Sequence, residues 1–73
     1  MDTIDDAPYL ALGLRIAAYR VRKDLLQREL AAKMKMDQAV LSKLESGTRR
    51  ATYDQARWLA VNANIAMKHW GFK

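Results

Sequence analysis

Apolar residues recur at helical spacing along most of the chain, and no stretch shows the strict alternation typical of a strand. The predicted helices span residues 8–23, 27–34, 38–46 and 52–61, and one more turn is expected within 65–73. In the first of them Leu12, Ile16 and Tyr19 share a face, and Val21 and Leu25 are expected to complete the core. The pattern therefore predicts an all-α protein, a compact bundle of four to five short helices.

Residues 27–47 predict two short helices joined by a tight turn. The two apolar faces consist of Leu30, Ala31 and Met34 in the first helix and Leu41 and Leu44 in the second. Small Ala31 permits the close backbone approach that two steeply crossing helices need across a turn of three or four residues. This arrangement predicts a helix-turn-helix at about 27–46, whose second helix protrudes far enough to enter a major groove.

Residues with cap and stop preferences stand at the expected helix ends. Asp37 is expected to cap the helix that begins at 38, and Gly47 is expected to end it. Thr52 and Gln55 have the spacing of a capping box. The fourth helix is expected to stop through left-handed residues, for which Asn62 and Asn64 are the candidates.

The same segment resembles a known family. Gln27, the pair Leu30-Ala31 and the run from Ser42 through Glu45 to Gly47 match the pattern of the XRE/Cro-like repressors, which share the lambda-repressor-like DNA-binding fold. The resemblance covers about residues 10–65. Departures from the family pattern are Leu26 at a cap position, Lys35 at a turn position often held by Gly, Ala51 in place of a common Pro, and Ala63 in place of a large Leu.

The resemblance implies which residues meet DNA bases. These are Gln38, Ala39, Ser42 and Lys43, at the start and on the outer face of the third helix. Their chemistry agrees, because Gln bonds adenine in a bidentate way, Lys donates to guanine and Ala contacts the thymine methyl group. For Ser42 a phosphate contact or a bond to its own helix is the alternative. The alternative for the whole set is an ordinary solvated helix face.

The resemblance also implies phosphate contacts and one ion pair. The phosphate-contacting residues would be Gln27, Arg49, Arg50 and Arg20. Arginine suits phosphate through its planar fork, and Gln27 opens a helix whose backbone N–H groups favour an anion. Arg20 is also expected to pair with Glu45 and to lock the third helix. The alternatives are a plain surface Gln27 and two separate surface charges.

Charge and composition favour a nucleic-acid partner and exclude most other chemistry. Three of the eight acidic residues lie within the first six positions, so residues 7–73 carry 13 basic and 5 acidic residues, a net charge of +8. Such an excess favours a polyanionic partner. The chain contains no cysteine and one histidine, His69, and it lacks clustered carboxylates and a Gly-rich phosphate loop. We therefore expect no enzyme activity, no metal and no cofactor.

The expected organisation is a single DNA-binding domain with two flanking segments. Residues 1–7 are expected to be a disordered acidic N-terminus, residues 8–65 the helix-turn-helix domain, and residues 66–73 a C-terminal tail. Trp70 and Phe72 in this tail are expected either to pack back on the first helix or to contribute to a dimer contact. Trp58 is expected in the core or at an interface.

These observations favour one function over two others. The leading hypothesis is a sequence-specific regulator of double-stranded DNA, a homodimeric repressor that binds a short inverted repeat. The alternative is an antitoxin or another interaction module whose main contact is a toxin or other protein partner. An enzyme is the third class and is disfavoured. No signal peptide or membrane span is apparent, so a cytoplasmic protein of bacterial or phage origin is expected.

Overall fold

Four α-helices and one 3-10 turn form the structure, a computed structural model that describes residues 7–72. The elements are α2 (Leu10–Arg22), α3 (Gln27–Lys33), α4 (Gln38–Ser46), α5 (Tyr53–Asn62) and the turn η1 (Met67–Trp70). No strand occurs within this part of the chain, so the predicted all-α class is confirmed. The predicted disordered terminus, apart from Ala7, lies outside the described residues.

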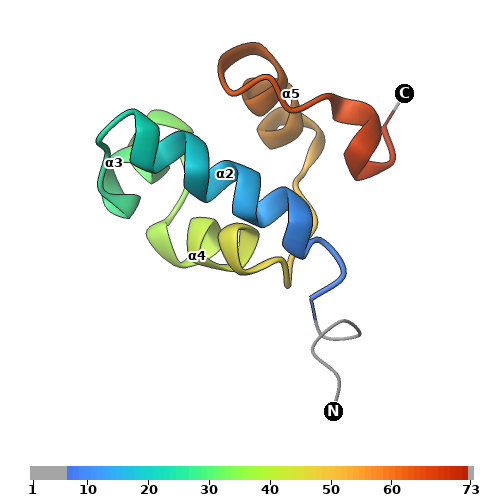
Figure 1. Ribbon diagram of the computed structural model, residues 1–73, viewed down its shortest axis with the longest axis horizontal. Coiled ribbons are helices and arrows are strands. Elements are labelled where there is room, and N and C mark those ends of the chain that lie inside the picture. The colour runs from blue at the N-terminus through green and yellow to red at the C-terminus, as the bar shows by residue number, and fades with distance from the viewer. Residues whose placement is uncertain (1–6, 73) are drawn as a thin grey trace.

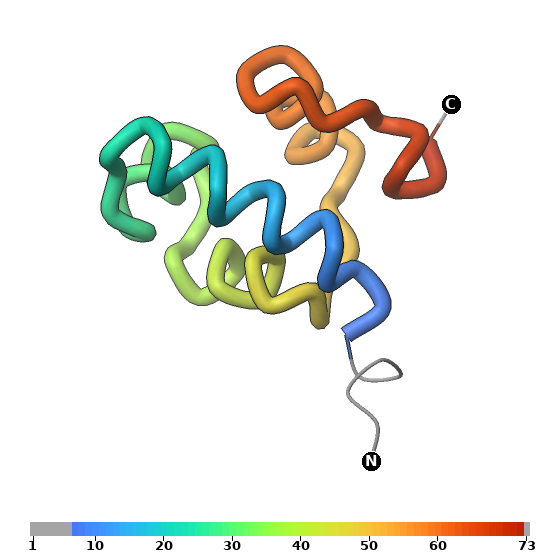
Figure 2. Tube along the Cα trace, in the orientation of Figure 1, coloured from blue at the N-terminus to red at the C-terminus, as the bar shows by residue number. Residues whose placement is uncertain are grey.

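Helix α2 runs across the middle of the molecule and organises the other elements (Figure 1). Helix α4 packs along α2 on one side, and α3 contacts α4 at the end where α2 finishes. Helix α5 and η1 lie together on the other side of α2. The chain path in Figure 2 shows α3 and α4 joined by a short turn, with α4 at the outer edge of the molecule.

The core forms where these elements meet. Its fully buried large side chains come from every element and from the segment before η1: Ile16, Leu30, Leu41, Leu44, Leu59, Ile65 and Trp70. Leu12 and Tyr19 are also buried, and Leu25 packs against the core while partly buried, as predicted. The prediction for Val21 is wrong, because its side chain is 67% exposed. At 100° per residue Val21 lies about 140° around the helix from Ile16, so it points away from the core.

Three of the predicted helix ends have the expected geometry. Gly47 is left-handed at φ 81°, and the backbone N of the next residue, Thr48, donates to Lys43 O at 3.1 Å. Thr52 and Gln55 form the reciprocal capping box, with Thr52 N donating to Gln55 Oε1 at 2.9 Å and Gln55 N to Thr52 Oγ1 at 3.3 Å. Asn64 is left-handed at φ 57°.

Two predicted caps differ in the structure. Asp37 occupies the N-cap position of α4 in an extended conformation, but its carboxylate accepts no capping hydrogen bond. Asn62 is the last residue of α5, and its Nδ2 donates to Trp58 O at 2.9 Å instead of marking a left-handed stop. At Leu26, where a side-chain cap is impossible, Glu29 Oε1 accepts from the Leu26 backbone N at 2.7 Å. Glu29 thus satisfies one of the exposed donors at the start of α3.

Two small residues allow the helices to approach closely. Ala31 is 2% exposed, in agreement with its predicted role in the helix-turn-helix crossing. Gly13 has the tighter position, since a Cβ atom there would lie 2.4 Å from Glu45 O and 2.5 Å from Leu44 O. The backbone of α2 therefore rests directly on the end of α4. The requirement for glycine at this position was missed by the pattern of apolar residues, because it depends on a contact 31 residues away.

The C-terminal segment packs on its own chain. Trp70 is 2% exposed and lies against Tyr9, with ring centroids 5.7 Å apart. Phe72 meets Tyr53 edge to face at 5.6 Å. Of the two alternatives for the tail aromatics, packing against the start of the first helix is therefore the one that the structure shows for Trp70. Trp58 is half-buried and stacks edge to face on Tyr19 at 6.2 Å.

Candidate nucleic-acid interface

The outer face of α4 carries the four residues that were predicted to contact bases. Leu41 and Leu44 anchor the opposite face in the core, where both are completely buried. Because the helix turns by 100° per residue, the positions on the side opposite these two leucines point outward. The side chains exposed there are Gln38, Ala39, Ser42 and Lys43. The structure thus brings them together on one protruding surface, which is the geometry that entry into a groove requires.

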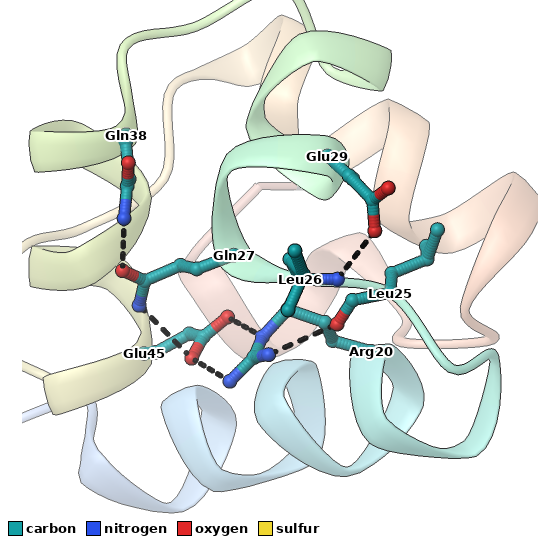
Figure 3. A network of polar contacts seen from close by, with 7 residues as sticks. All are labelled: Arg20, Leu25, Leu26, Gln27, Glu29, Gln38 and Glu45. Atoms are coloured by element: carbon teal, nitrogen blue, oxygen red, sulfur yellow. Dashed lines mark hydrogen bonds and ion pairs between the residues drawn. The ribbon is translucent and has the colours of Figure 1, made fainter.

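An ion pair fixes α4 relative to α2. Arg20 on α2 binds Glu45 on α4 through two hydrogen bonds, Nε to Oε2 at 2.8 Å and Nη2 to Oε1 at 3.2 Å (Figure 3). The side chain of Glu45 is only 9% exposed and that of Arg20 is 21% exposed. A bidentate pair shielded in this way has a defined orientation as well as attraction. The predicted pairing of Arg20 with Glu45 is therefore present.

Two glutamines extend this pair toward the exposed start of α4. Gln27 Nε2 donates to Glu45 Oε1 at 3.3 Å, and Gln38 Nε2 donates to Gln27 Oε1 at 3.3 Å. Figure 3 shows the resulting chain of side chains from Arg20 through Glu45 and Gln27 to Gln38. It connects α2, α3 and α4. Gln27 therefore braces the first turn of the predicted recognition helix, and its bond to Gln38 is a contact that the sequence did not reveal.

The contacts of Arg20 within the chain give it a structural role. Besides binding Glu45 it donates through Nη1 to the carbonyl oxygen of Leu25 at 3.1 Å, which fixes the turn before α3. A guanidinium has five N–H donors, so two remain for a phosphate after these three bonds. The phosphate contact predicted for Arg20 stays a prediction.

The two arginines after α4 have different surroundings. Arg49 is exposed, and no hydrogen bond or ion pair involves its side chain within residues 7–72. Arg50 Nε donates to Trp70 O at 2.6 Å, and its guanidinium lies over the Phe72 ring at 4.3 Å. Arg50 therefore holds the C-terminal segment against the loop, whereas Arg49 is available to an anion. The phosphate contact predicted for Arg50 competes with these two interactions.

Other kinds of site find no support in the described residues. Within 7–72 no group of three or more His, Asp or Glu side chains lies close enough together to hold a metal ion. In the same range no helix has the length and apolar character needed to cross a membrane. The candidate site consists of the exposed face of α4 and the hydrogen-bond network of Arg20, Glu45, Gln27 and Gln38 that holds this helix in place.

The arrangement of α3, turn and α4 defines the class: a helix-turn-helix protein with a protruding second helix. The sequence profile described as "Helix-turn-helix" matches residues 16–60, well over half of the 73-residue chain. The chain belongs to the XRE/Cro-like helix-turn-helix family and is a DNA-binding regulator in the general sense. Comparison with curated proteins and with solved structures gave no match.

Proposed function

We propose that the protein is a sequence-specific transcriptional regulator of double-stranded DNA, a homodimeric repressor that occupies a short inverted repeat. The observation that carries this proposal is the orientation of Gln38 by Gln27 on the exposed start of α4. Occlusion of a promoter by the bound dimer would account for repression without a second domain.

The hydrogen-bonding capacity of Gln38 supports base reading. A glutamine carboxamide has two N–H donors and one carbonyl acceptor. Gln38 donates one of its two N–H groups to Gln27. One donor and the acceptor remain, which is the pair that bidentate binding to adenine N7 and N6 requires. Since the carboxamide is held before DNA arrives, less side-chain entropy is lost on binding. Gln38 is thus proposed to read adenine.

The other residues of the surface complete the proposed contact. Lys43 lies on the same outer face and would donate to guanine, while Ala39 would contact a thymine methyl group. Ser42 would bond a base edge or a phosphate. Arg49 follows the recognition helix and would bind the phosphate backbone, which fixes the register on the duplex without reading sequence.

A protein-interaction module such as an antitoxin is the alternative function. Its main support in the sequence was the pair of tail aromatics as a possible docking surface. Trp70 is 2% exposed and Phe72 is half-buried, so this support is reduced. The exposed side chains of Lys43 on α4 and Arg49 after it instead favour DNA.

Selection from a random duplex library at about 150 mM salt tests the proposal, because non-specific binding weakens steeply with salt. The expected result is enrichment of an inverted repeat with half-sites about one helical turn apart. Gln38→Ala should lower affinity for that site by about 1–3 kcal/mol and relax the preference at one position of each half-site. Recovery of no sequence, with only weak salt-sensitive binding, would favour the interaction module.

A second experiment, which measures DNA binding by arginine variants, distinguishes phosphate contact from base contact. Arg49→Ala should weaken binding to all sequences alike and reduce the salt slope by about one unit. Arg57→Ala is the matched control, because Arg57 is an exposed arginine on α5. Equal effects of the two substitutions would show that Arg49 acts through net charge alone.

A further inference from the structure

A groove with lysines at its edges lies beside Trp58, where the ends of α2 and α3 meet α5. It consists of two hollows of about 500 Å³ and about 630 Å³ that share Lys33 and Trp58. The first hollow is lined by Tyr19, Lys23, Leu25, Lys33, Trp58 and Asn62. The second extends along α5 to the start of that helix. We refer to the two hollows together as the Trp58 groove.

The floor of the Trp58 groove is aromatic and apolar. Trp58 is half-buried and is supported by the buried Tyr19, which it meets edge to face at 6.2 Å. Leu25 lines the first hollow and Met34 lines the second. The indole of Trp58 therefore has a defined position while part of its surface stays open to the groove. A supported aromatic ring in a hollow is suited to hold an apolar side chain of a ligand.

Three exposed lysines surround this floor. Lys23 lines the first hollow, Lys35 lines the second, and Lys33 lines both. Within residues 7–72 none of the three takes part in an ion pair. Among the same residues Asp54 is the one acidic side chain that lines either hollow. The groove thus has an excess of positive charge, which favours an anionic ligand.

We propose that the Trp58 groove binds an acidic peptide segment of a partner protein, in which an apolar side chain is flanked by carboxylates. The apolar side chain packs on the indole of Trp58, and the carboxylates pair with Lys33 and with Lys23 or Lys35. Lysine suits this task, because its ammonium group on a flexible stem pairs with a carboxylate without a fixed geometry. Exposed ion pairs are individually weak and are screened by salt, so binding requires the apolar contact as well.

Asp54 favours a peptide over a strand of nucleic acid. Aromatic rings beside basic side chains also occur in sites for single-stranded nucleic acid. Such a strand carries a phosphate at every nucleotide, however, and Asp54 lies in the second hollow together with Lys33 and Lys35. A phosphate there would meet a carboxylate. A peptide avoids this repulsion, because it can place an uncharged residue opposite Asp54 and its carboxylates opposite the lysines.

The Trp58 groove is separate from the candidate nucleic-acid interface. No residue of α4 lines it, and neither does Arg49. Helix α5, which forms one wall of the groove, lies on the other side of α2 from α4 (Figure 1). A partner in the groove would therefore contact the protein through a surface that the proposed base contacts do not use. The inference goes beyond the proposed function and does not depend on it.

Fluorescence anisotropy with synthetic peptides tests the inference. The probe is the fluorescein-labelled peptide Gly-Glu-Asp-Phe-Glu-Asp-Gly. One matched peptide has Ser in place of Phe, and another has Gln and Asn in place of Glu and Asp. Both should bind the full chain more weakly than the probe does, because the first lacks the apolar side chain and the second lacks the carboxylates.

Two charge reversals in the full chain test the position of the site. Lys33→Glu should weaken binding of the probe by about fivefold or more. Lys68→Glu is the matched control, because it changes the net charge by the same amount and Lys68 is an exposed lysine on η1 that lines neither hollow. It should leave the affinity nearly unchanged. Circular dichroism verifies that both variants are folded.

Nuclear magnetic resonance of the wild-type chain locates the peptide without any substitution in the groove. The probe should shift the indole N–H signal of Trp58 and the backbone amide signals of Lys33 and Lys35. The signals of Ser42 and Lys43 on α4 should stay in place. Since the chain contains two tryptophans, the spectrum of Trp58→Phe identifies which indole signal belongs to Trp58.

Four outcomes overturn the inference. Equal effects of Lys33→Glu and Lys68→Glu would mean that net charge alone attracts the peptide. An unchanged affinity for the Ser peptide would mean that the apolar floor takes no part. Signals that shift only on α4 would place the peptide on the candidate nucleic-acid interface. Tighter binding of a short oligothymidylate that shifts the Trp58 signal would assign the groove to single-stranded nucleic acid. None of these results bears on the selection of duplex DNA, so the proposed function stands or falls separately.

Discussion

The close contact between α2 and α4 at Gly13 gives the sharpest test of how the recognition helix is held. Gly13→Ala adds one methyl group to the face of α2 that rests on α4. That methyl group would lie 2.4 Å from Glu45 O and 2.5 Å from Leu44 O. Both obstacles are backbone atoms, which cannot rotate aside as a flexible side chain would. The helices must therefore move apart, and α4 is the helix that carries the predicted base contacts.

The magnitude follows from the geometry. Ordinary contact begins at 3.4 Å, so relief of a 2.4 Å contact needs a separation of 1.0 Å between the two backbones. Overpacking of this kind costs about 3 kcal/mol, at the upper end of its usual range. The higher helix propensity of alanine offsets about 1 kcal/mol of this cost. The expected net loss is about 2 kcal/mol, a large share of the total stability of about 4–11 kcal/mol expected for 73 residues.

Urea and thermal unfolding of the purified protein measure this loss. For a domain of this size the melting temperature should fall by about 8–16 °C. Ala32→Gly on the exposed side of α3 is the control, since it reports helix propensity alone and should cost about 1 kcal/mol. A Gly13→Ala protein as stable as the wild type, or more stable, would refute the close packing of α2 on α4.

Three further changes test other parts of the structure. A double-mutant cycle of Arg20→Ala and Glu45→Ala should give a coupling of about 1–3 kcal/mol in urea unfolding, and a coupling near zero would refute the ion pair. Trp70→Ala should destabilise the protein by about 3–5 kcal/mol, because the side chain is 2% exposed; wild-type stability would mean that the tail does not pack on Tyr9. Lys35→Gly should stabilise the protein by about 1 kcal/mol in the same assay, because Lys35 has a φ of 59°, and a loss of stability would contradict that conformation.

The bracing network has a consequence for how the surface is used. Arg20, Glu45 and Gln27 do not lie on the outer face of α4, yet they fix the side chain that begins it. Replacement of Glu45 should therefore alter base preference as well as stability. In the same way Arg50 connects the loop after α4 to the C-terminal segment, so contacts at that segment bear on the loop that follows the recognition helix.

Much of this architecture was determined by the sequence itself, because its causes are local. The periodicity of apolar residues placed the helices within one or two residues of their observed bounds. Gly47 and the pair Thr52–Gln55 acted as the stop and cap that their chemistry predicts. The exposed positions of α4 also followed, since a buried Leu41 and Leu44 leave only one face free.

Tertiary structure decided what depends on contacts between distant residues. Val21 has the apolar character of a core residue, but the direction of its face relative to α4 and α5 leaves it exposed. Asp37 is a good cap by type, yet its side chain makes no capping bond. The need for glycine at position 13, the bond between Gln27 and Gln38, and the diversion of Arg50 to Trp70 join residues 11 to 32 positions apart. Helix periodicity and capping act within a few residues, so they cannot specify such pairs; only the packing of the folded chain does.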